Sequence, residues 1–398
     1  MRRAIRGVGR RIAAGWLALA PCAALADDLP AFAPYRPLYP ASYLEVGVTH
    51  DDGDEAFDAG GHRGASALPV LGGDSRLPET RATARFTWTF PLFEADGVPF
   101  FSDRLHTARV TVRAADLRAR GAIDDVEGVG APEGGDGSGL GDTTLEFGSF
   151  LAGSGRWREG KVERVSVLLL FGLTVPTGVY EHEAVANAGT NHPAGHVALG
   201  LHARAWTGGF ADVGVRYTGH GTDEEPAYGG LVPSRQGGTV SWDARLAQRL
   251  RPGLYLALGV EGFDTSRNRY ANVTFVPNAP EPPLLSDVTA VDATFRDGGT
   301  SWLAGTLALR WFVLPRLAAT VEYRHPFAGE SGEPVIDLVF RTPAGCDPSA
   351  LTCAVTDAGQ ARADGLGGAR SLASDRIGLS LTWQFGQGDT FTCPGCES

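Results

Sequence analysis

The sequence predicts an all-β fold, a transmembrane antiparallel up-and-down β-barrel of about twelve strands. Three observations support this prediction: apolar and polar residues alternate strictly in segments of about ten, long and short connections take turns between these segments, and the mean hydropathy is close to zero at −0.08. A tilted strand of about ten residues is long enough to cross a bilayer. Alternation gives each strand one lipid-facing and one lumen-facing side, so a near-zero average conceals the membrane character.

The alternation is clearest in residues 81–90, 107–114 and 376–385. In each of these segments alanine, valine, isoleucine, leucine or aromatic residues alternate with arginine, threonine, serine, glycine or glutamine. Both faces of such a strand cannot be dry, because unpaired charges in an apolar core cost several kcal/mol. Extending the pattern along the chain predicts strands over 42–50, 80–90, 105–115, 140–151, 163–175, 195–207, 210–219, 238–250, 254–264, 301–313, 316–326 and 374–386.

The connections between these segments carry independent information. Those after every odd strand are long and rich in Gly, Pro and acidic residues, whereas several after even strands are tight, as at 207–209, 251–253 and 314–315. This rhythm is typical of a barrel with short periplasmic turns and long outer loops, and a β-sandwich has no reason to produce it. Trp88, Trp311 and Trp383 lie near strand ends, where an interfacial girdle of aromatic residues is expected.

The N-terminus has the features of an export signal. A basic start and a short apolar run lead to Ala24-Leu25-Ala26, so we expect cleavage between Ala26 and Asp27. A lipoprotein cysteine at Cys22 is a weaker alternative, because Pro21 stands where a small residue is required. We therefore expect a signal peptide over 1–26, a Pro-rich segment over 27–40, a barrel over 41–386 and a C-terminal tail over 387–398.

Four cysteines remain after such cleavage, in an oxidising setting. Cys346 and Cys353 enclose six residues, which suits a local disulfide, and Cys393 and Cys396 form a CxxC near the C-terminus. Without a second CxxC or a βαβ context, the latter is weak as a redox or metal motif, so a tail disulfide is the preferred interpretation.

Net charge limits the partners. The chain carries −11, and the first 26 residues hold five arginines and no acid, so the remainder carries −16. This excludes nucleic acid as a partner, because phosphate binding needs a basic surface. The acidic runs at 51–55 and 223–225 fall in expected outer loops, either solvated or bridged by cations to lipopolysaccharide in the outer leaflet.

The face opposite the apolar one is rich in charge of both signs. Two interpretations stay open: the charges pair across neighbouring strands and hold the lumen together, or excess arginine forms a positive constriction that favours anionic or aromatic solutes. The candidate lumen-lining residues are Arg85, Arg109, Arg113, Asp142, Glu146, Arg204, Arg216, Asp243, Arg245, Glu261, Arg310, Glu322, Arg324 and Arg376.

Histidines are the natural candidates for catalysis or metal binding: His182, His192, His196, His202 and His220. No His–Ser pairing has a spacing that would bring both residues to one level on adjacent strands, as a hydrolase would need. A metal site built from the 181–183 segment, His192 and His196 has no recognised ligand spacing, so solvated loop histidines are the preferred interpretation. We therefore expect no catalytic residue, no metal and no cofactor.

Three motifs occur in order: Gly-Leu-Gly-Asp-Thr-Thr-Leu-Glu-Phe at 139–147, Val-Pro-Thr-Gly-Val-Tyr at 175–180 and Asn-Ala-Gly-Thr-Asn at 187–191. On these residues the chain, over about 139–263, resembles the MetA-pathway phenol-degradation family. The resemblance implies an outer-membrane barrel of a Gram-negative bacterium, associated with aromatic or other hydrophobic compounds. It supplies no catalytic residue to carry over. Its glycines and proline are expected to serve turns at strand ends.

Barrels of this kind usually finish on an aromatic residue that the barrel-assembly machinery recognises. Phe385 fits this role, although thirteen residues, 386–398, follow it. The leading functional hypothesis is a porin-like channel for passive passage of small hydrophobic or aromatic solutes. The alternatives are an outer-membrane enzyme that modifies lipid and a secreted β protein with a structural or adhesive role.

Overall fold

The computed structural model describes most of the chain between Ser42 and Phe385. The described residues are 42–53, 55–57, 62–65, 78–91, 104–118, 136–153, 164–180, 187–223, 234–267, 269–270, 273–275, 290–296, 299–314, 316–331, 335–341, 360–364 and 371–385. The expected signal cleavage at Ala26 and Asp27, the Pro-rich segment, the four cysteines and the C-terminal tail all lie outside these residues. Those expectations therefore remain predictions.

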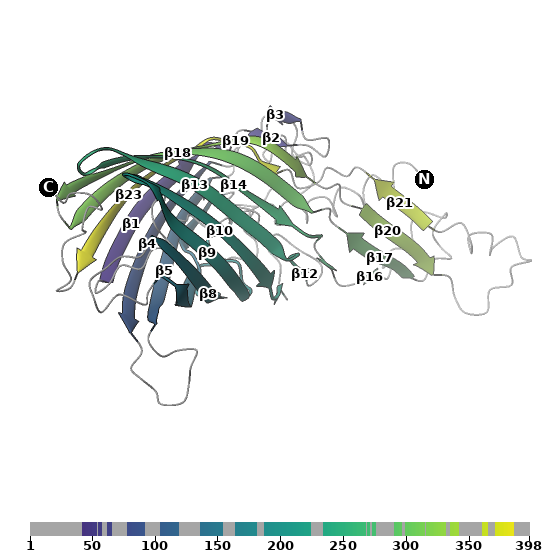
Figure 1. Ribbon diagram of the computed structural model, residues 1–398. Coiled ribbons are helices and arrows are strands. Elements are labelled where there is room, and N and C mark those ends of the chain that lie inside the picture. Colours follow the sequence, from purple (N-terminus) through teal and green to yellow (C-terminus); the bar gives the residue numbers. More distant parts are fainter. Residues whose placement is uncertain are drawn as a thin grey trace, which may run out of the picture.

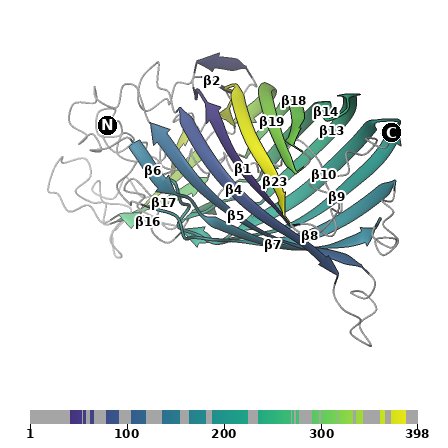
Figure 2. The same cartoon turned by 90° about the vertical axis from the view of Figure 1, so that its left-hand side faces the viewer.

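The main sheet closes on itself as a twelve-stranded antiparallel barrel (Figures 1 and 2), which confirms the predicted fold class. The first barrel strand pairs with the last, and every other neighbour in the ring is also adjacent along the chain. The barrel strands are β1 (Ser42–Asp51), β4 (Glu79–Pro91), β5 (Leu105–Arg118), β7 (Thr143–Ala152), β8 (Val165–Val175), β9 (Ala194–Trp206), β10 (Gly209–His220), β13 (Thr239–Arg251), β14 (Leu254–Thr265), β18 (Thr300–Leu314), β19 (Leu317–Ser331) and β23 (Arg376–Phe385).

Each predicted strand corresponds to a barrel strand, with one correction. The segment expected as a single strand over 140–151 is interrupted at Gly141 and Asp142. Residues before the break form β6 (Asp136–Leu140), which pairs with the far end of β5, and residues after it form β7. The Gly141 amide donates a hydrogen bond to the Arg113 carbonyl on β5, so the backbone stays attached where the strand breaks.

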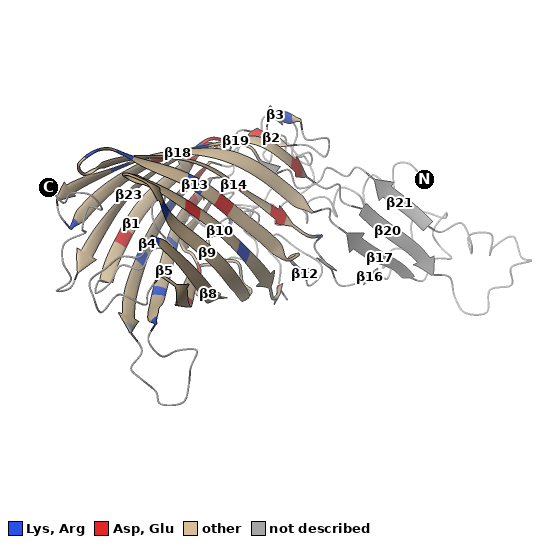
Figure 3. Cartoon of the chain, in the orientation of Figure 1, with Lys and Arg blue, Asp and Glu red and all other residues tan. Residues whose placement is uncertain are grey.

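The two faces of the barrel differ as alternation predicts. On β23, Ile377, Leu379 and Leu381 are about half exposed on the outside, whereas Thr382 and Gln384 are buried on the inside. The same division holds on the other barrel strands, and Figure 3 shows charged residues distributed along them. An exposed apolar surface that surrounds the whole ring is far larger than a soluble monomer tolerates, so the outer face requires lipid.

Exposed tryptophans mark the end of the barrel that carries the short turns. Trp88, Trp206, Trp311 and Trp383 each lie near the C-terminal end of a strand and are about half exposed. The indole ring is amphipathic and prefers the boundary between hydrocarbon and water. This end therefore lies at a membrane interface, as expected from the sequence.

The long connections contain short strands that alternation did not predict. One three-stranded sheet joins β2 (Glu55–Phe57), β3 (Arg63–Ala65) and β22 (Ser371–Leu372). A seven-stranded sheet joins β11 (Thr222–Asp223), β12 (Ser234–Arg235), β15 (Arg269–Tyr270), β16 (Val273–Phe275), β17 (Ala290–Arg296), β20 (Val335–Arg341) and β21 (Gln360–Asp364). Most of these strands are too short to show a period of two. No helix long and apolar enough to span a membrane occurs within the described part of the chain.

Candidate functional site

The inner wall of the barrel carries a buried charge network centred on Glu146 of β7. One carboxylate oxygen of Glu146 accepts hydrogen bonds from His196 Nε2 on β9, at 2.9 Å, and from Arg216 Nη2 on β10, at 3.2 Å. The charges of Arg85 on β4 and Arg109 on β5 also act on this carboxylate. We call these five residues the Glu146 network. A single carboxylate is the hub for four basic side chains from four strands.

A second buried network has the form of a chain. Glu261 of β14 lies between Arg245 of β13, at 3.4 Å, and Arg324 of β19, at 3.7 Å. Arg324 also reaches Asp51 of β1, at 3.4 Å, and Asp51 lies 3.7 Å from Arg376 of β23. We call these five residues the Glu261 network. Because it links β1 to β19 and β23, it holds together the first and last strands where the barrel closes.

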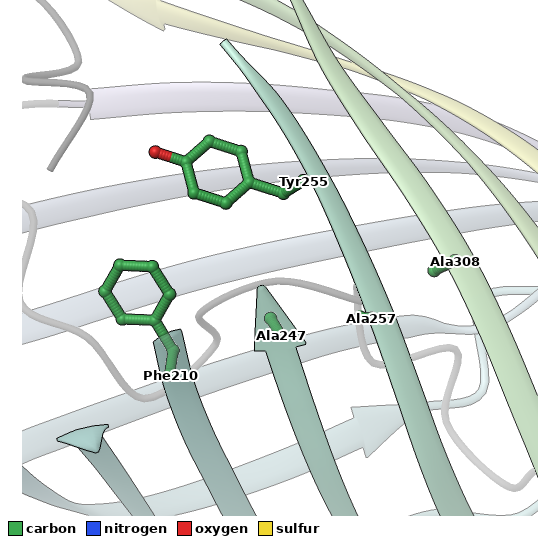
Figure 4. Packing of buried hydrophobic residues seen from close by; sticks show 5 residues of the cluster. All are labelled: Phe210, Ala247, Tyr255, Ala257 and Ala308. Carbon is green, nitrogen blue, oxygen red and sulfur yellow. The ribbon is translucent and has the colours of Figure 1, made fainter. Parts of the chain in front are cut away.

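An aromatic cluster faces the interior near the short turns. Phe210, Tyr255 and Phe312 are 5.9–6.2 Å apart between successive ring centroids, and Ala247, Ala257 and Ala308 pack beside them. Figure 4 shows the rings of Phe210 and Tyr255 extending from β10 and β14 into the same space. Basic side chains flank this cluster.

Two of those side chains make specific contacts with the rings. The guanidinium of Arg310 lies 5.5 Å from the Phe312 centroid, and the His202 ring stacks on Phe210 at 5.6 Å. His202 Nδ1 donates a hydrogen bond to Asp212 at 2.7 Å, which fixes its ring against the phenyl group. The inner wall thus holds flat apolar rings next to an arginine and a histidine, with Phe210 and Tyr255 each less than a tenth exposed.

The three sequence motifs meet in a clasp at the end of the barrel that carries the long connections. Asp142 accepts hydrogen bonds from the backbone amides of Gly178, at 3.0 Å, and Thr190, at 2.9 Å, and from the Thr190 hydroxyl. Gly178 and Gly189 face each other so closely that a Cβ on Gly178 would lie 2.6 Å from the Gly189 Cα. The motifs therefore share one structural task, which is to join the connections that enter β7 and leave β8.

The structure gives the fourteen candidate lumen residues different environments. Nine are buried on barrel strands: Arg85, Arg109, Glu146, Arg216, Asp243, Arg245, Arg310, Arg324 and Arg376. Arg113, Glu261 and Glu322 are partly buried. Asp142 belongs to the clasp instead of a strand, and Arg204 is exposed beside the turn at 207–208.

Asp51 and Glu79 were missed as interior residues. Both are buried at strand ends, Asp51 in the Glu261 network and Glu79 beside Arg81. The expectation of a solvated acidic run at 51–55 is therefore wrong for Asp51. A signal existed, because Asp51 continues the inward alternation of Tyr43, Glu45, Gly47 and Thr49. These added carboxylates favour the interpretation in which the lumen charges pair with one another.

Two expectations about histidine and serine are also wrong. His192, His196, His202 and His220 are buried, not solvated. Ser166 does lie opposite His202 in the β8–β9 register, contrary to the expectation that no serine would meet a histidine in this way. The alternation of apolar and polar residues in β8 and β9 does not reveal which residues lie opposite each other. The register between the two strands depends on the connection that joins them. Ser166, His202 and Asp212 all face inward and are buried, away from lipid.

Comparisons with known proteins agree with this architecture. The model of the family described as "Putative MetA-pathway of phenol degradation" matches residues 83–276. The resemblance expected from the motifs is confirmed, and it extends further toward the N-terminus than the motifs alone indicated. None of the curated proteins matches the chain.

Among solved structures, the COG4313 outer membrane channel from Pseudomonas putida F1 is similar, with a TM-score of 0.57 and 15% identity. The match covers 88% of this chain and 98% of that protein. The chain is an outer-membrane β-barrel. The TodX monoaromatic hydrocarbon channel is more distant, with a TM-score of 0.40 and 9% identity over 86% of this chain and 89% of that protein, a likeness too low to carry an argument.

Proposed function

We propose that this barrel is a channel for passive passage of small hydrophobic or aromatic solutes across the outer membrane. The aromatic cluster on the inner wall carries the proposal. A lumen for fully hydrated solutes gains nothing from inward phenyl rings, because such rings hold water poorly. An aromatic solute, in contrast, can stack on Phe210 or Tyr255 and then move on through contacts that are individually weak.

Basic groups outnumber carboxylates in both networks, by four to one around Glu146 and by three to two in the Glu261 network, so the inner wall does not attract free cations. An uncharged solute meets no such opposition. The Arg310 guanidinium lies 5.5 Å from the Phe312 ring centroid, and a guanidinium attracts the face of an aromatic ring. The matched family and the similar channel support the same class of function without defining a solute.

A lipid-modifying enzyme is the less favoured alternative. An enzyme acting on membrane lipid needs its nucleophile and base at the lipid-facing surface or in an opening to it. His196 and His202 instead donate to Glu146 and Asp212 on the inner wall, with side chains less than a tenth exposed. We therefore expect no lipid hydrolysis by the wild-type barrel, and the same result for His202→Ala.

Solute flux into proteoliposomes tests the proposal. Phenyl glucoside and methyl glucoside share a sugar that crosses bilayers poorly, and a pore that sorts only by size admits the smaller methyl compound faster. We expect this barrel to admit phenyl glucoside faster. A barrel that is closed to both compounds, or that follows size order, contradicts the proposal.

Variants connect the preference to the cluster. Phe210→Leu and Tyr255→Leu remove rings but keep apolar volume, so the phenyl preference should fall several-fold while the barrel still folds. Phe150→Leu is a matched control, because Phe150 is equally buried but packs with Leu105, Leu168 and Leu170, away from this cluster. Its flux ratio should equal that of the wild type.

A further inference from the structure

Two buried histidines at the end of the barrel with the long connections have ring nitrogens that no hydrogen bond satisfies. His192, just before β9, and His220, the last residue of β10, are less than a tenth exposed. Among the residues that the structure describes, they are the histidines that lack a hydrogen-bond partner at both Nδ1 and Nε2. The two residues thus present four buried, unsatisfied nitrogen atoms side by side.

This arrangement is costly unless something binds there. A buried polar group without a partner loses its hydrogen bonds to water, and such groups are rare in native proteins. The neighbouring buried histidines follow the usual rule, because His196 donates to Glu146 and His202 to Asp212. Burial alone therefore does not explain the contrast with His192 and His220.

The backbone holds the two rings close together. Ala194 is the register partner of His220, and the Gly221 amide donates to the Pro193 carbonyl at 2.7 Å. The ring centroids of His192 and His220 are 5.7 Å apart, with the ring planes inclined at 66°. Two imidazoles that bind one tetrahedral zinc ion through bonds of about 2.0–2.1 Å have centroids roughly 5 Å apart. A small side-chain adjustment is enough to share an ion.

Surrounding contacts fix this local geometry. Asn191, immediately before His192, has a φ of 54°, a left-handed conformation that is uncommon for a residue other than glycine. Its side-chain amide donates to Asp223 at 3.2 Å, and Thr190, whose hydroxyl donates to Asp142, has its Oγ1 only 3.2 Å from the His192 carbonyl oxygen.

We propose that His192 and His220 bind a divalent transition-metal ion such as Zn²⁺, each through one ring nitrogen, with water completing the coordination. Neutral imidazole is a preferred ligand for zinc, copper and nickel. Within the described part of the chain no group of three or more His, Cys, Asp or Glu residues is arranged to hold a metal, so protein ligation rests on these two rings. The guanidinium of Arg235 donates to the His220 carbonyl at 2.9 Å, and Asp223, whose backbone pairs with Ser234 next to Arg235, places a buried carboxylate on the adjacent strand.

The ion would pin the segment before β9 to the end of β10, next to the clasp formed by the three motifs. This role is independent of solute passage, so failure of the channel proposal would leave it intact.

Calorimetric titration with Zn²⁺ tests the site in the full-length barrel, refolded in detergent. Wild type should bind one more zinc ion than His192→Ala/His220→Ala, and either single variant should lose at least tenfold in affinity for that ion. His50→Ala is the control, because His50 is exposed and lies away from the pair. It should titrate like the wild type, and zinc bound elsewhere cancels in the comparison.

A second readout follows folding. Zn²⁺ should raise the unfolding temperature of wild type and of His50→Ala but not that of His192→Asn/His220→Asn, whose amides keep the site polar if the alanine variants do not fold. Equal zinc stoichiometry in wild type and the asparagine double variant, or an equal rise in their unfolding temperatures, would overturn the proposal.

Discussion

The Glu146 and Glu261 networks use the same residue types on the same inner wall but are connected differently. Glu146 is a hub, with one carboxylate surrounded by His196, Arg216, Arg109 and Arg85. In the Glu261 network acid and base alternate along a chain, and Arg324 contacts two carboxylates. We therefore expect the stability of the barrel to depend less on the number of ion pairs in the lumen than on how many basic groups share one carboxylate.

Replacing the hub should have the largest effect. Glu146→Gln leaves several buried basic groups without their shared carboxylate, so we expect a loss of about 3–5 kcal/mol in unfolding free energy. Glu261→Gln is the matched change in the Glu261 network. It should lower the unfolding free energy by about 1–2 kcal/mol, because Asp51 still pairs with Arg324. Urea titration of the detergent-refolded barrels measures the unfolding free energy of both variants. The folded fraction at each urea concentration is read from the gel, because folded barrels migrate differently from heat-unfolded ones. Equal losses in the two variants would contradict the distinction between hub and chain.

A smaller effect is expected in the clasp, which lies just before the strand that carries Glu146. Gly178→Ala forces a methyl group into the 2.6 Å approach to Gly189 and should cost about 1–3 kcal/mol. Gly195→Ala on β9 is the control, since its nearest atom would lie 3.9 Å from the new Cβ. The same unfolding assay applies. If Gly195→Ala destabilises the barrel as much as Gly178→Ala, close approach in the clasp is not the cause.

The smallest effect is expected just outside the Glu261 network, where the same kinds of group meet water. Asp375 lies next to Arg376 and accepts hydrogen bonds from His325 Nδ1, at 2.7 Å, and the Tyr323 hydroxyl, at 2.6 Å. Burial alone would raise the pKa of Asp375, but these hydrogen bonds outweigh it and lower the pKa below its ordinary value. Since this side chain is 41% exposed, Asp375→Asn should cost no more than about 1 kcal/mol.

The pH dependence of this small contribution has a definite sign. A carboxyl group with a lowered pKa in the folded state stabilises the protein above its ordinary pKa and loses that contribution as the pH falls through the lowered value. The stabilities of wild type and Asp375→Asn should therefore differ at neutral pH and converge in acid. A difference that grows as the pH falls would show that the sign is wrong.

Much of the barrel could be predicted because each strand repeats one rule. Lipid on one side and a charged lumen on the other impose a period of two, and every predicted barrel strand was found within a few residues of its expected position. Asp142 was wrongly predicted to line the lumen on a barrel strand. The strand breaks at Gly141 and Asp142, but the polar pattern of the sequence continues through the break and does not reveal it. Most of the short strands in the long connections could not be predicted, since two or three residues cannot display a period, whereas β17 and β20, with seven residues each, were missed although they are long enough to show one.

Candidate lumen residues were predictable as a class but not as contacts. Alternation put Glu146, Glu261 and Arg324 on the inner face, whereas the partners of each depend on which strands are adjacent and on their register. Asp51 contacts Arg324, 273 residues further along the chain, and no local pattern connects them. Ser166 and His202 show the same limit, because their pairing depends on the length of the connection between β8 and β9.

The sequence by itself determined the fold class, the lipid-facing surface and the positions of the barrel strands. Lipid on the outer face and a polar lumen on the inner face select an apolar or a polar residue at each position, whatever its neighbours are. Only the tertiary structure decided that Glu146 is a hub, that Asp51 and Arg376 help close the ring, that three motifs form one clasp, and that His192 meets His220. Asp51 meets Arg376 because the ring closes, whereas the other contacts depend on which strands are adjacent and on their register, which no local sequence pattern specifies.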